Sequence, residues 1–401
     1  MKEAARELAA VMSRADPLAS FVFEFWDGER ITVGARPRAT LRLKTPQAAR
    51  SMFGKGFHGF GEGYVDGDLE VEGDLLDLLR LGLEARFYEG AHSWWQKIRF
   101  LPFYLKTKGL PERARGNIEY HYDRSDEFYS LFLDKTMTYS CAYFASDDDT
   151  LEQAQKNKFD HIARKLRLAP GDTLLDIGCG WGGLLLHCAG RYGIKGLGNT
   201  LSSNQFEYVN REVEQRGMGG RLRVLMADYR RLTGTFDKFV SVGMFEHVGR
   251  EFIPAYMEKV AGLLKKGGLG LLHTISKDVE SPTDTWLQRY IFPGGYVPSL
   301  PEIVREMGRA GFCILDIEGL RPHYAATIER WIANFEANAD KVLQMFDEKF
   351  VRMWRLYLNA SCAGFKYDGT RLYQVLFSNG LNNDVPMTRD YMYGNGGIDI
   401  T

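Results

Sequence analysis

A group of glycines follows one acidic residue in the segment Asp176-Ile-Gly-Cys-Gly-Trp-Gly182. Gly178, Gly180 and Gly182 allow the backbone to approach a ligand closely, and the helix expected after them offers free N–H groups. The spacing is GxGxG, which differs from the GxGxxG of dinucleotide sites and from the GxxxxGK[ST] of phosphate-binding loops. Asp176, two residues before the first glycine, suits a cation better than a pyrophosphate. The segment therefore predicts a loop that binds a cationic ligand.

This segment resembles the first motif of class I S-adenosylmethionine-dependent methyltransferases, whose cofactor is a sulfonium cation. In most such enzymes the second strand ends in Asp or Glu, which binds the ribose hydroxyls, whereas here it ends in Asn199-Thr200. The third strand does end in an acid, Asp228, and we expect Asp228 and the adjacent Tyr229 to bond and stack with the adenine. The resemblance implies S-adenosylmethionine as cofactor, with its ribose held differently or less strongly than usual.

Six further segments resemble cyclopropane-fatty-acyl-phospholipid synthases and the related mycolic acid cyclopropane synthases and C-methyltransferases. They follow the family's order within about residues 115–380: TYSCAYF (138–144), TLSSNQ (200–205), MFEHVG (244–249), YIFPGG (290–295), HY (323–324) and RMW…SCAG (352–364). This family also lacks the acid at the end of the second strand. The segment 59–79 resembles the extra amino-terminal domain of the phospholipid-acting enzymes, which favours membrane phospholipid as the substrate.

The resemblance implies transfer of a methylene group to the cis double bond of unsaturated acyl chains. Methyl transfer leaves a carbocation, so the enzyme needs a base close to the new methyl group and a dry pocket. In this family the base is thought to be a bound bicarbonate. By motif match, the catalytic residues that hold it are Glu246, His273, Ile275, Tyr324 and, through its main chain rather than as a nucleophile, Cys141. The implied cofactor-binding residues are Tyr139, Ser140, Asp176, Gly178, Gly180, Gly182, Thr200, Gln205, Asp228 and Tyr229.

Topology supports part of this site independently of the family. His273 ends the fifth expected strand and Glu246 follows the fourth, and doubly wound sheets bind ligands at that edge. Without the resemblance, His273 would be interpreted as a core histidine, Glu246 as a carboxylate at a helix start and Tyr324 as a loop-packing aromatic. No HxH, HExxH or second carboxylate accompanies them, so no metal is expected.

Alternating helices and buried strands after residue 150 predict an α/β fold, a Rossmann-like doubly wound sheet of seven strands as in class I methyltransferases. The expected strands are 173–178, 195–200, 221–228, 236–244, 269–276, 312–319 and 370–378. The helix over 251–268 is expected to end at its Lys-Gly-Gly. We assign 111–401 to this catalytic domain, with helical insertions that form an acyl-chain pocket.

A smaller α+β domain is expected over residues 1–110, for lipid binding or dimerisation. Its expected parts are a hairpin over 21–33 around Asp27-Gly28, a strand at 41–44, a helix from Pro46, a glycine-rich loop over 54–63 and a helix over 74–87. The resemblance of this domain favours a homodimer.

Composition restricts the class of protein. The 401 residues are 45% apolar and 26% charged with a net charge of −1, which excludes a disordered chain and disfavours a nucleic-acid partner. No apolar run is long enough to span a membrane, and the first seventeen residues lack the apolar stretch of a secretory signal. The five cysteines include no CxxC pair and fit a reducing compartment. We therefore expect a cytoplasmic enzyme that associates peripherally with the inner membrane surface.

The small net charge conceals opposed stretches. Residues 30–55 are basic and 62–77 acidic, while 94–115 combine basic and aromatic side chains. The last segment suits an anionic membrane surface, although a solvated linker helix remains the alternative. The tail 385–401 has no interpretation, and its Tyr391 and Tyr393 either dock on the body or lie in a loose end.

Three functions remain open from the sequence. The first is cyclopropane synthesis on phospholipid acyl chains. The second is a fatty-acyl C-methyltransferase that yields methylene or methyl branches. The third is a lipid-binding protein without activity, for which the intact glycine loop gives no support.

Overall fold

The computed structural model describes residues 1–87, 125–281 and 284–393, and the chain divides into two compact units. Unit 1 comprises residues 1–108, 284–293 and 328–369. Unit 2 comprises residues 109–283, 294–327 and 370–401. The basic and aromatic segment 94–115 lies outside the described residues.

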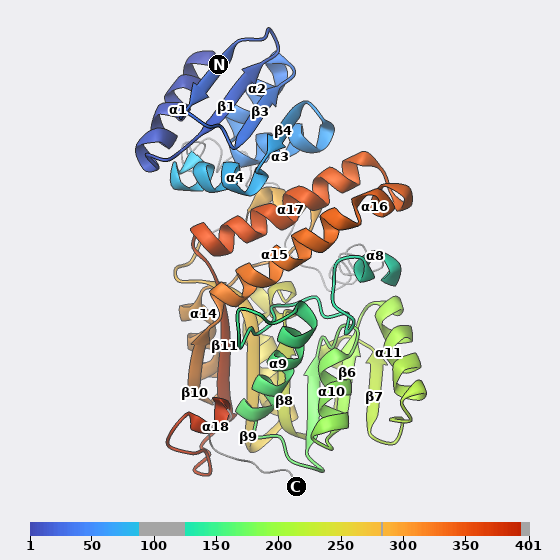
Figure 1. Ribbon diagram of the computed structural model, residues 1–401. Helices are drawn as coiled ribbons and strands as arrows, with labels where there is room; N and C mark the ends of the chain where they lie inside the picture. Colours follow the sequence, from blue (N-terminus) through green and yellow to red (C-terminus); the bar gives the residue numbers. More distant parts are fainter. Residues whose placement is uncertain (88–124, 282–283, 394–401) are drawn as a thin grey trace. The chain divides into compact units, whose positions relative to one another are not determined.

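Unit 1 contains a four-stranded sheet in the order β2-β1-β3-β4 (Figure 1). The predicted hairpin is confirmed, because β1 and β2 pair antiparallel, and β3 adds parallel to β1. The strands are β1 (Phe21–Phe25), β2 (Arg30–Val33), β3 (Ala39–Leu43) and β4 (Leu69–Gly73). The helices are α1 (Lys2–Ala15), α2 (Pro46–Lys55), α3 (Phe57–Asp66), α4 (Leu75–Glu84), α13 (Thr285–Tyr290), α16 (Ala339–Met345), α17 (Glu348–Tyr367) and the part of α15 (Arg321–Ala337) that follows Thr327.

The opposed charges of this unit meet on its sheet. Arg42 of the basic stretch pairs with Glu72 of the acidic stretch at 2.9 Å, and Lys44 pairs with Glu70. β3 and β4 run antiparallel and place these side chains across from one another. Part of the charge asymmetry seen in the sequence is therefore internal neutralisation between neighbouring strands.

The predicted glycine loop is wrong, because the structure forms a helix there, α3. A Cβ on Gly59 would lie 2.0 Å from the carbonyl oxygen of Ser51, and one on Gly61 would lie 2.6 Å from Nε1 of Trp286. These glycines let α3 approach α2 and α13 more closely than any side chain would allow. The close packing outweighs the poor intrinsic helix propensity of glycine.

Unit 2 is built on a sheet in the order β10-β11-β9-β8-β5-β6-β7. Its central strands are parallel, and β11 runs antiparallel to both β9 and β10. The strands are β5 (Thr173–Ile177), β6 (Lys195–Thr200), β7 (Leu222–Met226), β8 (Phe236–Val242), β9 (Leu264–Lys277), β10 (Phe312–Gly319) and β11 (Thr370–Asn379). This is the class I methyltransferase arrangement that the sequence predicted.

Helices cover both faces of that sheet. One apolar cluster packs α9, α10 and α11 against one face, and a second packs α12 and α14 against the other (Figure 1). The helices are α8 (Asp126–Ser130), α9 (Leu151–Lys165), α10 (Gly183–Arg191), α11 (Ser203–Gln215), α12 (Ile253–Leu263), α14 (Leu300–Arg309), the start of α15, and α18 (Asp390–Tyr393), with short 3₁₀ turns at Tyr229–Arg231, Phe245–His247 and Arg250–Phe252. Among the described helices, none combines the length and apolar character needed to cross a bilayer.

The predicted end of the helix over 251–268 is also wrong. Helix α12 stops at Leu263, and the Lys-Gly-Gly belongs to the long strand β9. The pairing of β8 with β9 shifts register between Phe236 and Lys238, where β9 carries extra residues. Gly267 has φ +76°, a conformation that favours glycine and accommodates this irregularity.

The described part of the tail docks on unit 2. Met392 is buried, and its carbonyl oxygen lies 3.2 Å from Nδ1 of His161 and accepts a 2.9 Å bond from Nε of Arg164. Arg389 pairs with the buried Asp316 at 2.5 Å. The tail is therefore fixed as far as Tyr393.

Candidate active site

The glycine loop joins β5 to α10 and is left-handed at three positions. Gly178, Gly180 and Gly182 have φ values of +82°, +55° and +78°. A Cβ on Gly178 would lie 2.5 Å from Met244, and one on Gly182 would lie 2.8 Å from Val209. At Gly180 no atom of the described residues lies within 4 Å of the Cβ position. Two glycines thus serve internal packing, and Gly180 faces space that a ligand can occupy.

The predicted cofactor residues form one group along this edge of the sheet. They occupy the turn before α9, the carboxyl ends of β5, β6 and β7, and the residues that directly follow. The hydroxyl of Thr200 donates to Oε1 of Gln205 at 2.7 Å, so these two lie together. Asn199, at the position where the acid was missing, accepts from Gly178 N–H at 3.4 Å and donates to the Ala227 carbonyl at 2.9 Å. Its side chain therefore holds the glycine loop against the next strand.

Asp228 is engaged by a neighbour. Its Oδ1 accepts from the backbone N–H of Arg230 at 2.9 Å and from Nε of Arg230 at 2.8 Å. Burial raises the pKa of Asp228, but the bonds from Arg230 outweigh burial and hold the pKa below its usual value. Tyr229 packs edge-on against Tyr256 with ring centroids 5.2 Å apart. Asp228 is therefore ionised and the ring of Tyr229 is held in place, as the predicted contacts with adenine require.

Asp176 is buried at the end of β5, and its Oδ1 has no hydrogen-bond partner among the described residues. Burial raises the pKa of Asp176 to about 7, against the opposing charge of Lys158. Lys158 is itself only 1% exposed and donates to Oγ of Ser140 at 2.9 Å. Lys158 was not among the predicted site residues, although its position on the apolar face of α9 indicates a special role, since an unpaired lysine is rarely buried.

The turn that carries Tyr139, Ser140 and Cys141 is held by the start of α15. The N–H of Ala142 donates to Oγ1 of Thr327 at 3.0 Å, and the N–H of Phe144 donates to Nδ1 of His323 at 3.1 Å. The ring of Tyr143 stacks on His323 with centroids 4.6 Å apart. The sequence indicated no role for Thr327 and named His323 only within a motif, because hydrogen bonds that span 185 and 179 residues leave no local pattern.

Cys141 and Tyr324 meet around the same helix start. The Cys141 Sγ lies 3.1 Å from the carbonyl oxygen of Ala142 and 4.0 Å from that of Leu320. The Tyr324 N–H bonds to the same Leu320 carbonyl at 3.2 Å. Burial raises the pKa of the Cys141 thiol, so the thiol stays protonated and is a poor nucleophile.

Glu246 is buried in the short turn after β8. Its Oε1 accepts from the backbone N–H of Ile275 at 2.6 Å, and its Oε2 has no partner among the described residues. Burial raises the pKa of Glu246 to about 7, against the bond from Ile275. The structure therefore joins two predicted residues, with Ile275 acting through its backbone to fix the carboxylate.

His273 lies two residues before Ile275 on β9 and is 1% exposed. Its Nδ1 is 3.1 Å from Nε2 of Gln374. With the Gln374 amide in this orientation, Nδ1 accepts and the ring proton lies on Nε2. That Nε2 has no partner in the described part of the chain. Burial lowers the pKa of His273 well below its usual value, so the ring is neutral. This edge of the sheet thus presents one buried donor and one buried acceptor, both unpaired.

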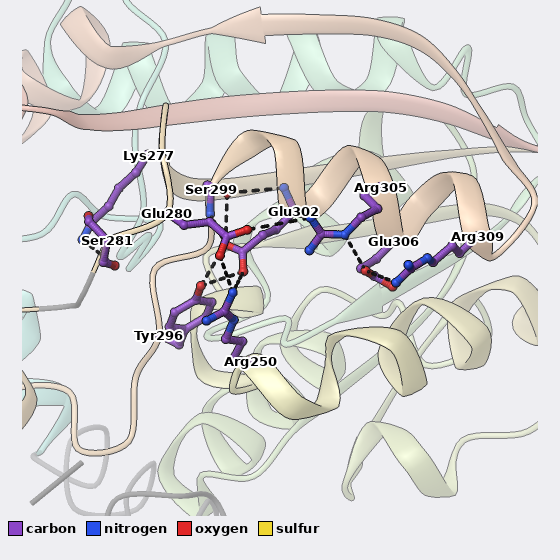
Figure 2. Close-up of polar contacts among 10 residues, drawn as sticks. All are labelled: Arg250, Lys277, Glu280, Ser281, Tyr296, Ser299, Glu302, Arg305, Glu306 and Arg309. Carbon is purple, nitrogen blue, oxygen red and sulfur yellow. Dashed lines mark hydrogen bonds and ion pairs between the residues drawn. The ribbon is translucent and has the colours of Figure 1, made fainter. Parts of the chain in front are cut away.

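A polar network around Glu302 supports the turn that carries Glu246, and Figure 2 shows the side chains of that network, among them Arg250 and Tyr296. The backbone N–H of Tyr296 donates to the Glu246 carbonyl at 2.9 Å, and the Tyr296 hydroxyl donates to both oxygens of Glu302, at 2.9 and 2.8 Å. Arg250, in the 3₁₀ turn just after Glu246, pairs with Glu302 at 3.0 Å. Ser299 and Glu302 form a capping box at the start of α14. The turn that carries Glu246 is therefore held by Tyr296 and Arg250, which Glu302 connects.

The described residues contain no group of three or more His, Cys, Asp or Glu side chains arranged to hold a metal ion. What the geometry offers is a buried edge of the sheet with a glycine cradle, an unpaired carboxylate on Asp176, and the donor and acceptor of His273 and Glu246.

Comparison with known proteins gives the family. A model for mycolic acid cyclopropane synthetases matches residues 111–375, and a model described as a domain of unknown function matches residues 10–90. A probable fatty acid methyltransferase of Pseudomonas putida is 37% identical over 389 residues, covering 92% of this chain and 95% of its own. The cyclopropane-fatty-acyl-phospholipid synthase of Escherichia coli K12 is 36% identical over 365 residues, covering 90% of this chain and 93% of its own. The solved mycolic acid cyclopropane synthase CmaA1, complexed with SAH and CTAB, matches with a TM-score of 0.63 and 35% identity over 66% of this chain and 98% of that chain.

The strand order of unit 2 and the match to CmaA1 show that the protein has the class I methyltransferase fold, with a small amino-terminal α/β domain in addition. The chain belongs to the mycolic acid cyclopropane synthetase family, whose model matches well over half of its residues. The relatives named above are, by name, a fatty acid methyltransferase and two cyclopropane synthases. All three names refer to a fatty acid or acyl group, and two of them specify cyclopropane synthesis.

Proposed function

We propose that the protein transfers a methylene group from S-adenosylmethionine to the cis double bond of unsaturated acyl chains in membrane phospholipids, and so forms cyclopropane chains. One observation carries this proposal. The donor on His273 and the acceptor on Glu246 are buried and have no partner among the described residues. His273 lies in β9, level with Val242 at the end of β8, and Glu246 follows β8, which pairs with the glycine-loop strand β5. Membership of the family supports the cofactor and the acyl substrate.

S-Adenosylmethionine fits this edge on two independent counts. Because the space at the Cβ position of Gly180 is open, a flat ligand can contact the backbone there without a clash. The unpaired Oδ1 of Asp176 offers a buried acceptor to a cationic group. A pyrophosphate would instead meet repulsion from that carboxylate.

The proposed reaction balances without an oxidant or a metal. The methyl carbon bonds to one alkene carbon as the carbon–sulfur bond breaks, and the sulfur keeps the electron pair. The positive charge on the other alkene carbon is removed when the new methyl group loses a proton and its electron pair closes the ring. The products are the cyclopropane chain, S-adenosylhomocysteine and one proton. The cation requires a site that excludes water, and the reactive edge described above is buried.

Bicarbonate fits the two unpaired groups. It carries an O–H for Oε2 of Glu246 and an acceptor oxygen for Nε2–H of His273. Bound there, it supplies the base for the methyl proton. The chain's own residues prepare the site. Ile275 N–H bonds to the Glu246 carboxylate and Gln374 holds the His273 ring at Nδ1, and we propose that Tyr324 and the Cys141 backbone complete the contacts.

The decisive experiment incubates the protein with S-adenosylmethionine and vesicles of a cis-monounsaturated phospholipid, then analyses the acyl chains by mass spectrometry. A gain of one CH₂ (about 14 Da) together with loss of the double bond is expected. Retention of the double bond at the same mass would identify a methylene-branched product and overturn cyclopropanation. Branching is the second candidate, and the description of the Pseudomonas putida relative favours it. Repeating the assay in bicarbonate-free buffer tests the base, and slower turnover is expected.

We also propose that the enzyme works as a homodimer at the cytoplasmic face of the inner membrane. The match to the Escherichia coli relative, which spans 90% of the chain, supports a phospholipid substrate. Flotation with anionic vesicles should fall as salt rises, because screening weakens contact with lipid headgroups. Light scattering at micromolar protein should give twice the chain mass. Salt-independent flotation or a monomer mass would contradict these two points.

A further inference from the structure

A buried lysine stands behind the turn that the resemblance assigns to the cofactor. Lys158 lies on α9 and is 1% exposed, and its Nζ donates to Oγ of Ser140 at 2.9 Å. From the same face of α9, Nε2 of Gln155 donates to the Ser140 carbonyl at 2.9 Å. Ser140 is therefore fixed at both its backbone and its side chain.

The bond between Lys158 Nζ and Ser140 Oγ determines which role the serine hydroxyl proton can take. A protonated lysine has donors and no acceptor, so the Ser140 oxygen must be the acceptor from Lys158. The Ser140 hydroxyl proton is then free to serve a second group. A hydroxyl that accepts from a cation is polarised and becomes a stronger donor, which suits an anion.

Asp176 provides a hydrogen-bond acceptor close to Lys158. Asp176 is 2% exposed, its Oδ1 has no partner among the described residues, and it interacts electrostatically with Lys158. Ser140 lies against the β8 end of this edge, with its Cβ 3.8 Å from the Cβ position of Gly243. One donor to an anion and one acceptor from a cation therefore lie at one edge of the sheet. A zwitterionic α-amino acid group has this pair of charges.

We propose that Lys158 is a positioning residue that directs the Ser140 hydroxyl toward the carboxylate at the amino-acid end of the cofactor, while Asp176 receives the ammonium of the same end. This inference rests on the proposed function, because it takes S-adenosylmethionine as the ligand. Lys158 touches no reacting atom. It acts through Ser140.

The test compares two ligands that differ only at that end. S-Adenosylhomocysteine carries the amino-acid group, and 5′-methylthioadenosine lacks it. Lys158→Met keeps the side-chain length and removes the charge, so we expect the Kd for S-adenosylhomocysteine to rise by about tenfold or more, in keeping with a charge-assisted bond. The Kd for 5′-methylthioadenosine should change by less than about twofold. Isothermal titration of the full chain measures both.

Three further variants keep the result interpretable. Lys158→Gln can still donate to Ser140 without charge and should fall between wild type and Lys158→Met. Lys158→Arg, which keeps the charge, should recover part of the affinity. Lys156→Met changes an exposed lysine on the same helix and should leave both affinities unaltered.

Equal weakening of both ligands in Lys158→Met and Lys158→Gln would show a general loss of structure and overturn the inference. No change for either ligand would overturn it as well. If the unaltered protein bound neither ligand, the proposed function would fail, and this inference with it.

Discussion

Glu246→Gln should make the protein more stable above neutral pH and nearly inactive. The Glu246 carboxylate is buried with one oxygen unpaired, and burial raises its pKa from 4.5 to about 7. Ionising it inside the folded protein is therefore costly. Glutamine keeps an oxygen that can accept from Ile275 N–H, and it carries no charge.

The sign and size of the effect follow from proton linkage. Between about pH 4.5 and pH 7 the folded state holds a proton that the unfolded chain has lost, so wild-type stability falls as pH rises through this window. Above pH 7 the loss is complete and amounts to about 3 kcal/mol, since one pKa unit corresponds to about 1.4 kcal/mol. The glutamine variant lacks this dependence. Its unpaired amide adds a cost that does not change with pH, so the pH-dependent part is diagnostic.

The assay is urea unfolding at about pH 5 and about pH 8, with hydrogen exchange of the β9 amides reporting on the strand whose Ile275 N–H bonds to Glu246. We expect the free energy of unfolding of Glu246→Gln, relative to wild type, to increase by about 2 to 3 kcal/mol between these pH values. Glu258→Gln makes the same chemical change at an exposed position of α12 and should show no such trend. A pH-independent difference for Glu246→Gln would refute the reasoning, because it would mean that the carboxylate is paired or solvated.

Four other substitutions test the site and the packing of unit 1. Gly180→Ala should weaken S-adenosylhomocysteine binding at least tenfold by calorimetry and cost about 1 kcal/mol of stability, because its φ is +55° and its open side faces the ligand. Gly61→Ala should lower the stability of unit 1 by about 2 kcal/mol in thermal unfolding, since its Cβ would lie 2.6 Å from the indole nitrogen of Trp286. The matched control is Gly82→Ala in α4, where the Cβ has open space, and it should stabilise unit 1 by about 0.5 kcal/mol. His323→Phe keeps an aromatic ring but leaves the Phe144 N–H without its acceptor. We expect kcat to fall about tenfold, while the affinity for S-adenosylhomocysteine changes by less than about twofold. An unchanged kcat would show that His323 does not position the turn at Phe144.

The sequence predicts the strands of unit 2 well because each is a short buried run between turn residues. It fails where glycine has a tertiary role. At Gly61 the poor helix propensity of glycine suggested a loop, whereas the contact with Trp286, more than 200 residues away, favours a helix. The glycines after Lys266 resembled a helix cap, but they allow an irregular β pairing. In each case the deciding contact is absent from the local sequence.

The residues of the candidate site also differ in how far the local sequence could predict them. Glu246 and His273 could be placed because strand ends meet at one edge of a parallel sheet. His323 could not, because its role is to bond a backbone amide in the turn at Phe144. Lys158 is intermediate, since periodicity buries it but does not show that Ser140 is its partner.

Two buried glutamates in unit 2 show why Glu246 is better explained by function than by burial alone. Glu302 is 2% exposed, and burial raises its pKa, yet bonds from Ser299 and Tyr296 and the charge of Arg250 outweigh burial and hold the pKa below its usual value. Glu246 accepts one backbone bond, its second oxygen has no partner among the described residues, and burial raises its pKa to about 7. The fold can satisfy a buried carboxylate fully, and it does so at Glu302 to anchor the turn that carries Glu246. Groups on Glu246, His273 and Asp176 without partners among the described residues cost stability at one sheet edge. The two ligands proposed above would complete the hydrogen bonds of all three.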